Sequence, residues 1–163
     1  MEERGRRRVE CGLLVGEKAK GNDGVAEAVR RTHNAIGYVD FASARKAGLS
    51  YAQLRNQAGR FVTPGTAAFQ AAAASADWRS VSDFGLQLID PPGETAYPLV
   101  ATTFVAMPRG AANAGHGRAV LAFFRWSLQN GTTAPAELGY VPLPPPFVEQ
   151  VLAYCSTQFD AKR

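Results

Sequence analysis

The sequence has few cysteines, few histidines and no long apolar run. Two cysteines among 163 residues exclude a disulfide-rich scaffold and a four-cysteine zinc site. The longest mostly apolar run, Tyr97 to Met107, contains Pro98 and two threonines and is too short to cross a bilayer. Hydrophobic residues make up 46% of the chain and charged residues 20%, so the composition is that of a globular protein.

Catalytic and metal-binding motifs are also missing. The sequence holds no nucleophile elbow, no Walker loop and no HExxH pattern. The two histidines, His33 and His116, have no cysteine nearby and no ligand partner at helical spacing. We therefore expect no metal site, no cofactor and no enzymatic activity.

Positive charge is concentrated at the start of the chain. Residues 1–60 carry 12 Lys and Arg against 7 Asp and Glu, and four of the arginines lie within the leader 1–12. Such an arm could hold an anionic partner, but it contains no interleaved aromatic residues and three glutamates dilute it, so no clear nucleic-acid pattern results. The alternative is an unstructured terminus with incidental charge.

The first fifteen residues do not fit an export signal. Their apolar part, around Leu13 to Val15, is shorter than the roughly 7–15 residues of a signal-peptide core. As written, the chain is expected to stay in the cytoplasm.

Hydrophobic periodicity predicts an α/β class in which helices alternate with buried strands. The alanine-rich run after Thr66, a possible cap, favours a helix, and the apolar surface of 118–130 is wide enough to predict deep burial. Two apolar runs with little alternation indicate strands buried on both faces of a parallel or mixed sheet. Helices are predicted over 22–33, 42–46, 66–76, 118–130, 134–138 and 147–154, and strands over 36–41, 51–57, 61–62, 84–89 and 99–107.

One loop has the character of an anion site. Gly21, Asn22 and Gly24 lie where a helix begins, and backbone N–H groups at a helix start attract negative charge. The competing interpretation is ordinary capping, with Asn22 or Asp23 as the cap and the Asp23 carboxylate in the anion's place.

Two further motifs have plain explanations. Cys155 falls among apolar positions and is expected to pack in the core, although pairing with Cys11 stays open. The triplet Asn130-Gly131-Thr132 matches a glycosylation acceptor, but Gly131 also fits a helix stop, which we favour.

Several segments, taken together and in order, resemble the periplasmic phosphate-binding proteins of phosphate ABC transporters. The resemblance extends over roughly residues 13–155. The segments are GNDGVAEAVRRTHNAIGYVDFASA from Gly21, SYAQLRNQAGRFVTP from Ser50, FQAAAASADW from Phe69, YPLVATTFVAM from Tyr97, FFRWSLQNG from Phe123 and LGYVPLP from Leu138.

The resemblance implies a partial type II periplasmic-binding-protein fold with portions of two doubly wound lobes. Residues 1–12 are an unmatched basic leader, 13–96 correspond to the latter part of the second lobe, and 97–163 correspond to a crossing strand and the returning part of the first lobe. It also implies a non-enzymatic, periplasmic protein that delivers inorganic phosphate to an ABC permease.

The groups that hold phosphate in this family lie outside the resembling region. The Arg-x-x-x-Ser-Gly-Thr pattern does not occur in the sequence, so no phosphate-binding residue is carried over. We expect a truncated family member with weak or absent phosphate binding and a tendency to self-associate through exposed sheet edges and apolar faces. The alternative is an interaction module that uses the basic arm and these edges to bind an anionic or protein partner.

Overall fold

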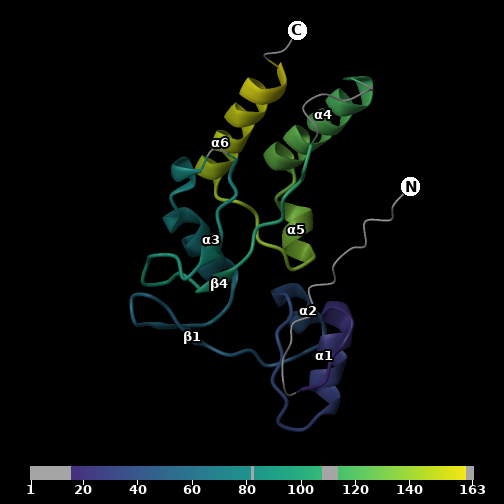
Figure 1. Ribbon diagram of the computed structural model, residues 1–163, viewed down its shortest axis with the longest axis vertical. Coiled ribbons are helices and arrows are strands. Elements are labelled where there is room, and N and C mark those ends of the chain that lie inside the picture. The colour runs from purple at the N-terminus through teal and green to yellow at the C-terminus, as the bar shows by residue number, and fades with distance from the viewer. Residues whose placement is uncertain (1–15, 82, 108–113, 161–163) are drawn as a thin grey trace, which may run out of the picture.

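The computed structural model describes residues 16–81, 83–107 and 114–160, so the basic leader and Cys11 lie outside the described residues. Helices dominate, and the strands are short (Figure 1). The elements in order are α1 (Gly21–Arg31), α2 (Phe41–Lys46), β1 (Leu54–Arg55), β2 (Phe61–Val62), α3 (Thr66–Ser75), a 3-10 turn η1 (Trp78–Ser80), β3 (Leu88–Ile89), β4 (Leu99–Val100), α4 (Ala114–Asn130), α5 (Thr133–Glu137), α6 (Pro145–Cys155) and a π-helical turn η2 (Ser156–Asp160).

The predicted helices are confirmed, with differences at their ends. Helix α1 begins at Gly21 after Lys20, so Asn22 and Asp23 lie in its first turn and neither is the cap. Helix α3 likewise begins at Thr66, and Gly65 precedes it as the cap. Helix α2 has a side-chain cap, because the Asp40 carboxylate accepts a hydrogen bond of 2.6 Å from the Ser43 N–H.

The predicted strands are mostly wrong in length. Residues 35–40 form neither helix nor strand, and Ile36 is 93% exposed. Only Leu99 and Val100 of the predicted strand 99–107 pair, in antiparallel register with Ile89 and Leu88. A buried strand needs neighbours on both sides, and the described residues supply none for 36–41 or 101–107.

The predicted two-stranded excursion is confirmed. Strands β1 and β2 pair antiparallel, with Leu54 opposite Val62 and Arg55 opposite Phe61. Within the described ranges, both sheets are therefore antiparallel pairs. The architecture is helix-rich with small sheets and is compatible with part of an α/β fold.

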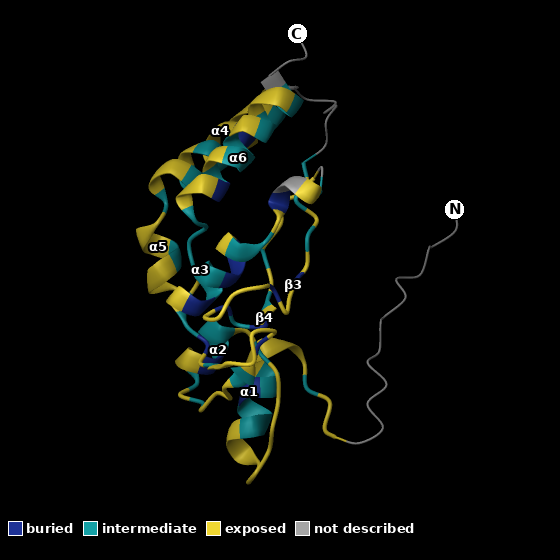
Figure 2. Cartoon of the chain, turned by 90° about the vertical axis from the view of Figure 1, so that its left-hand side faces the viewer, coloured by how far each residue is buried: buried dark blue, intermediate teal, exposed yellow. Residues whose placement is uncertain are grey.

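The core lies where α6 meets α3 and the β3–β4 pair. Trp78, Leu88 and Phe147 are buried there, and Phe84 and Val151 pack against them. The Trp78 indole N–H donates a hydrogen bond of 2.7 Å to the Ala73 carbonyl, which satisfies its one polar group. Figure 2 shows buried residues gathering around α3, whereas much of α4 and α5 is exposed.

Deep burial of the 118–130 helix is a wrong prediction. In α4, Leu121 is buried, whereas Phe123 and Trp126 are 59% and 60% exposed. Helix α4 runs beside α6 in both views, and no other described helix or strand covers its opposite face (Figures 1 and 2). None of the helices in the described ranges is both long and apolar enough to span a bilayer.

A buried side chain connects the first hairpin to the loop before β4. The Asn56 amide donates to the carbonyls of Gly93, Glu94 and Ala96 at 3.0, 2.9 and 3.1 Å. Its oxygen accepts from the Arg60 N–H at 3.0 Å. Asn56 therefore shares its two amide hydrogens among three carbonyls and fixes the path of residues 93–96.

Candidate functional site

The predicted anion-site residues lie together at the start of α1. Gly21 has a φ of +68°, a left-handed conformation that favours glycine. The Asn22 side chain makes two hydrogen bonds with Asp40. Its amide group donates to the Asp40 carboxylate, and its oxygen accepts from the Asp40 N–H at 3.4 Å. The structure thus brings a carboxylate of this chain to the residues predicted to attract an anion.

That carboxylate weakens the case for an external anion. Asp40 accepts from Asn22 and from the Ser43 N–H, so it links α1 to the cap of α2. A second negative ion beside it would meet repulsion. The anion site at Gly21, Asn22 and Gly24 stays a prediction.

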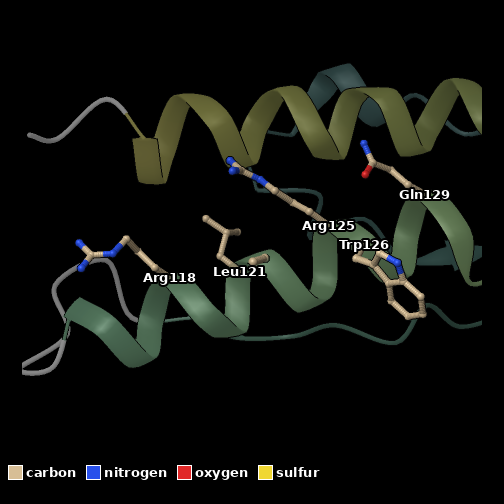
Figure 3. Close-up of a pocket in the computed structure, with 6 residues that line it drawn as sticks. Arg118, Leu121, Arg125, Trp126 and Gln129 are labelled. Atoms are coloured by element: carbon tan, nitrogen blue, oxygen red, sulfur yellow. The ribbon is translucent and has the colours of Figure 1, made fainter.

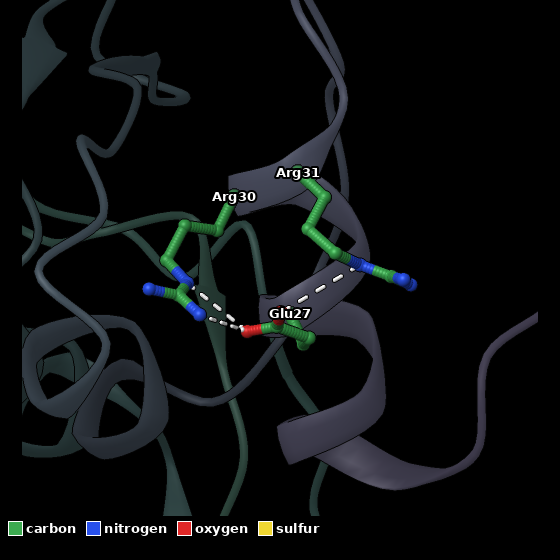
Figure 4. Close-up of polar contacts among 3 residues, drawn as sticks. All are labelled: Glu27, Arg30 and Arg31. Atoms are coloured by element: carbon green, nitrogen blue, oxygen red, sulfur yellow. Dashed lines mark hydrogen bonds and ion pairs between the residues drawn. The ribbon is translucent and has the colours of Figure 1, made fainter.

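The arginines of α1 do not supply a cation at this end of the helix. Arg30 and Arg31 lie in the last turn of α1, and both guanidinium groups contact Glu27, at 2.6 and 3.6 Å (Figure 4). The side chains of Arg30 and Arg31 are 63% and 64% exposed and that of Glu27 is 44% exposed, so these ion pairs contribute little to stability. They do, however, leave the arginines paired within the helix.

The larger cavity has a volume of about 1030 Å³ and lies between α2, α3 and β4 on one side and the 138–144 connector on the other. Its lining includes Asp40 and several hydroxyl groups, among them those of Tyr97, Thr102 and Tyr140. No lysine or arginine among the described residues lines it. The cavity therefore offers an oxyanion no positive partner.

Four aromatic rings make one wall of this cavity. Tyr51, Phe41, Phe69 and Tyr97 follow one another edge to face, with centroid separations of 5.4, 5.2 and 5.5 Å. Burial raises the pKa of the Tyr97 hydroxyl above its ordinary value. The wall is mainly apolar, which suits a hydrophobic occupant better than an ion.

A smaller cavity of about 370 Å³ lies along α4 on the side of α6 (Figure 3). Arg118, Arg125 and Gln129 line it together with Leu121 and Trp126. The Arg125 guanidinium reaches toward α6 and donates to the Ser156 hydroxyl at 3.4 Å. Sequence reasoning missed this cavity, although two arginines seven residues apart on one helix were a visible signal.

The remaining residues singled out in the sequence lie in or next to helices. Gly131 ends α4 as predicted, since its N–H donates to the Ser127 carbonyl at 2.7 Å. His116, expected in a loop, lies inside α4, and His33 lies in the turn after α1. Cys155 is half-buried at the end of α6, while its pairing with Cys11 concerns a residue outside the described part of the chain.

Similarity to known proteins covers nearly the whole chain. No protein-family model matches it. The phosphate-binding protein PstS of Xylella fastidiosa strain Temecula1 is 43% identical over 144 residues, which is 88% of this chain. The chain is PstS-like. The PstS proteins of Pasteurella multocida and Haemophilus influenzae are each 38% identical over 88% and 89% of it.

These relatives confirm the resemblance found in the sequence segments. The chain spans about 40% of the length of the Xylella relative, and 42% and 43% of the other two. The larger part of each PstS relative therefore has no counterpart in the match. Each of these relatives is named a phosphate-binding protein, which describes binding rather than catalysis.

Proposed function

We propose that this chain is a portion of the substrate-binding protein of a phosphate ABC transporter, with phosphate capture and transport as the function of the whole. The observation that supports this best is the 43% identity to PstS over 144 residues. Inorganic phosphate is then the ligand, an ABC permease the partner and the periplasm the compartment. The protein acts by binding, with no enzymatic step and no cofactor.

The proposal extends to the fold. Residues 13–96 belong to the latter part of the second lobe, and 97–163 form the crossing strand and the returning part of the first lobe of a type II binding protein. Support comes from the segment order, with β4 beginning at Leu99 just after the proposed boundary. The core nevertheless unites both sides of that boundary, since Trp78 and Phe147 are both members of it.

Phosphate binding by the 163-residue chain alone is proposed to be weak or absent. Tight phosphate sites combine backbone N–H groups, hydroxyls and an arginine fork. Here the larger cavity has no lysine or arginine among its described lining residues, and the start of α1 already holds the Asp40 carboxylate. At these two places the described groups therefore do not converge on one anion.

Calorimetry on two proteins tests the proposal. The first is the full chain, for which titration with phosphate is expected to show no sub-micromolar binding. The second is a chimera of the Xylella PstS in which this chain replaces the matched 144 residues. It is expected to bind phosphate, because the replaced segment then serves its proposed role. Sulfate is the control ion, since it has the same tetrahedral shape.

Two results would contradict the proposal. A folded chimera that fails to bind phosphate would show that this segment does not do the work of its PstS counterpart. Sub-micromolar binding by the chain alone would show that it contains a complete site. Amide shifts at Gly21, Asn22 and Gly24 during a phosphate titration would separately test the predicted anion site.

A further inference from the structure

The tip of the β1–β2 hairpin and the loop before β4 form one projecting edge of the molecule. They lie side by side at the left of Figure 1, and the Asn56 amide joins them by donating to three carbonyls of residues 93–96. Arg55 and Phe61 are opposite each other in the hairpin, so their side chains share one face. We use the name hairpin patch for four residues of this edge, Arg55, Arg60, Phe61 and Glu94.

Hydrogen bonds fix the backbone of the hairpin tip. The Asn56 N–H donates to the Arg60 carbonyl at 2.9 Å, and the Gly59 N–H donates to the Asn56 carbonyl at 2.9 Å. The Asn56 side-chain oxygen accepts from the Arg60 N–H at 3.0 Å. A surface with an ordered backbone loses less conformational entropy when a partner binds.

The side chains of the hairpin patch are exposed, and its charges are not neutralised within the described part of the chain. Phe61 is 69% exposed, and the other three members are exposed as well. The ion pairs among the described residues are confined to α1. Arg60 and Glu94 thus form no ion pair, although both contact the Asn56 side chain through their backbones. Arginine and aromatic residues are enriched at protein interfaces.

The mixed charge of the hairpin patch favours a partner with the same charges in reversed order. A two-fold axis through the patch provides this, because it places Arg60 of each copy opposite Glu94 of the other copy. A uniformly acidic partner would be repelled by Glu94, and a uniformly basic one by the two arginines. A second copy of this chain therefore fits the patch better than a partner of one charge sign.

We infer that the hairpin patch is a contact between two copies of this chain, in which two Arg60–Glu94 ion pairs form across a two-fold axis and Phe61 supplies the apolar contact. The inference goes beyond the proposed function and does not depend on it. The patch is small and charged, so the dimer is weak and dissociates when salt is added.

Sedimentation velocity of the full chain over a range of concentrations tests the inference. A reversible dimer is expected at low ionic strength. Arg60→Glu and Glu94→Arg are each expected to weaken it about tenfold or more, because each variant places like charges opposite one another at two positions. The double variant Arg60→Glu/Glu94→Arg is expected to restore the dimer, since both ion pairs form again with their signs exchanged.

Two further variants locate the contact. Arg118→Glu is the matched control, because it changes the net charge by the same amount as Arg60→Glu at an exposed position on α4. It is expected to associate as the parent does. Phe61→Ala is expected to weaken the dimer, whereas Phe123→Ala, which removes an exposed ring from α4, is not.

The other outcomes contradict the inference. The absence of a dimer at protein concentrations up to about 1 mM would overturn it. So would a dimer that both single charge reversals leave intact, an equal loss in Arg118→Glu, or a folded double variant that stays monomeric. Thermal unfolding checks that each variant has kept its fold. Calorimetry on the PstS chimera measures phosphate binding separately, so either proposal can fail while the other stands.

Discussion

The rings of Trp78 and Phe147 stack with their centroids 4.0 Å apart and their planes at 23°. The two residues come from η1 and α6, and Phe84 contacts the same Phe147 ring edge-on at 5.4 Å. Phe147 therefore holds the C-terminal helix against the middle of the chain. Because these contacts join segments far apart in the sequence, they stabilise the tertiary core rather than a local turn.

Phe147→Ala is expected to lower the free energy of unfolding by about 3–5 kcal/mol, since it removes a buried ring and leaves a cavity beside Trp78. Urea unfolding followed by tryptophan fluorescence measures the change. Phe123→Ala is the control, with a change within about 0.5 kcal/mol because its ring is exposed. Equal losses in both variants would contradict the packing described for α6.

Asn56→Ala is expected to lower the free energy of unfolding by about 1–3 kcal/mol, because three carbonyls of residues 93–96 lose their donor. Asn56→Asp should be worse, since its carboxylate would face those carbonyl oxygens. Chemical denaturation of both variants measures the effect, with Gln87→Ala at an exposed position as the control. A smaller loss for the aspartate than for the alanine would argue against the described hydrogen bonds.

Substitution of glycine by alanine is expected to have opposite effects on stability at two positions. A Cβ at Gly24, inside α1, would meet Ala19 Cβ at an ordinary 3.6 Å, so Gly24→Ala should stabilise the chain by about 0.5–1 kcal/mol through helix propensity. A Cβ at Gly37 would lie 2.7 Å from Val29 Cγ2, so Gly37→Ala should destabilise by about 1–3 kcal/mol. Thermal unfolding distinguishes them, and the same sign for both would show that residues 35–40 do not lie against α1 as described.

Stability should fall with rising pH where Tyr97 ionises. Burial raises the pKa of Tyr97 in the folded state above its ordinary 10.0. The unfolded state therefore loses its proton first, and the contribution present below pH 10 is lost as the pH rises through the folded-state pKa. Unfolding free energies measured from pH 8 to 11 should fall less steeply for Tyr97→Phe than for the parent. Parallel curves would contradict the partial burial of the Tyr97 side chain.

The helices could be predicted because their signals are local. The alanines of 66–76, the stop at Gly131 and the apolar face of 147–154 each lie within the element that they specify. Caps were less predictable: α1 and α3 each begin at or before the residue expected to cap them. A shift of one residue changes the cap but not the helix.

The strands could not be predicted to length, because pairing depends on residues elsewhere in the chain. The run 36–41 is apolar, but Gly37 lies against Val25 and Val29 of α1 instead of beside another strand. The run 99–107 pairs over two residues, since β3 is no longer than that. An apolar run indicates that a segment favours burial, but it does not indicate which residues pack against that segment.

For the candidate sites, too, local features could be predicted from the sequence and long-range contacts could not. The sequence predicted an anion site at the start of α1 from Gly21, Asn22 and Gly24, but the Asp40 carboxylate that contacts Asn22 lies 18 positions later in the chain. Leu138 was predicted to end a helix over 134–138, whereas its exposure, and that of Tyr140, beside β4 depends on the three-dimensional arrangement. Contacts between residues far apart in the chain could not be predicted from the sequence, whatever the residue types.

The Asn56 amide recognises main-chain oxygens and is indifferent to the side chains at 93, 94 and 96. The loop has constraints of its own, because Gly93 has a φ of +125° and Ala96 is 1% exposed, whereas Glu94 is exposed. Sequence drift among homologous proteins would then be wide at position 94 and narrow at 56, 93 and 96.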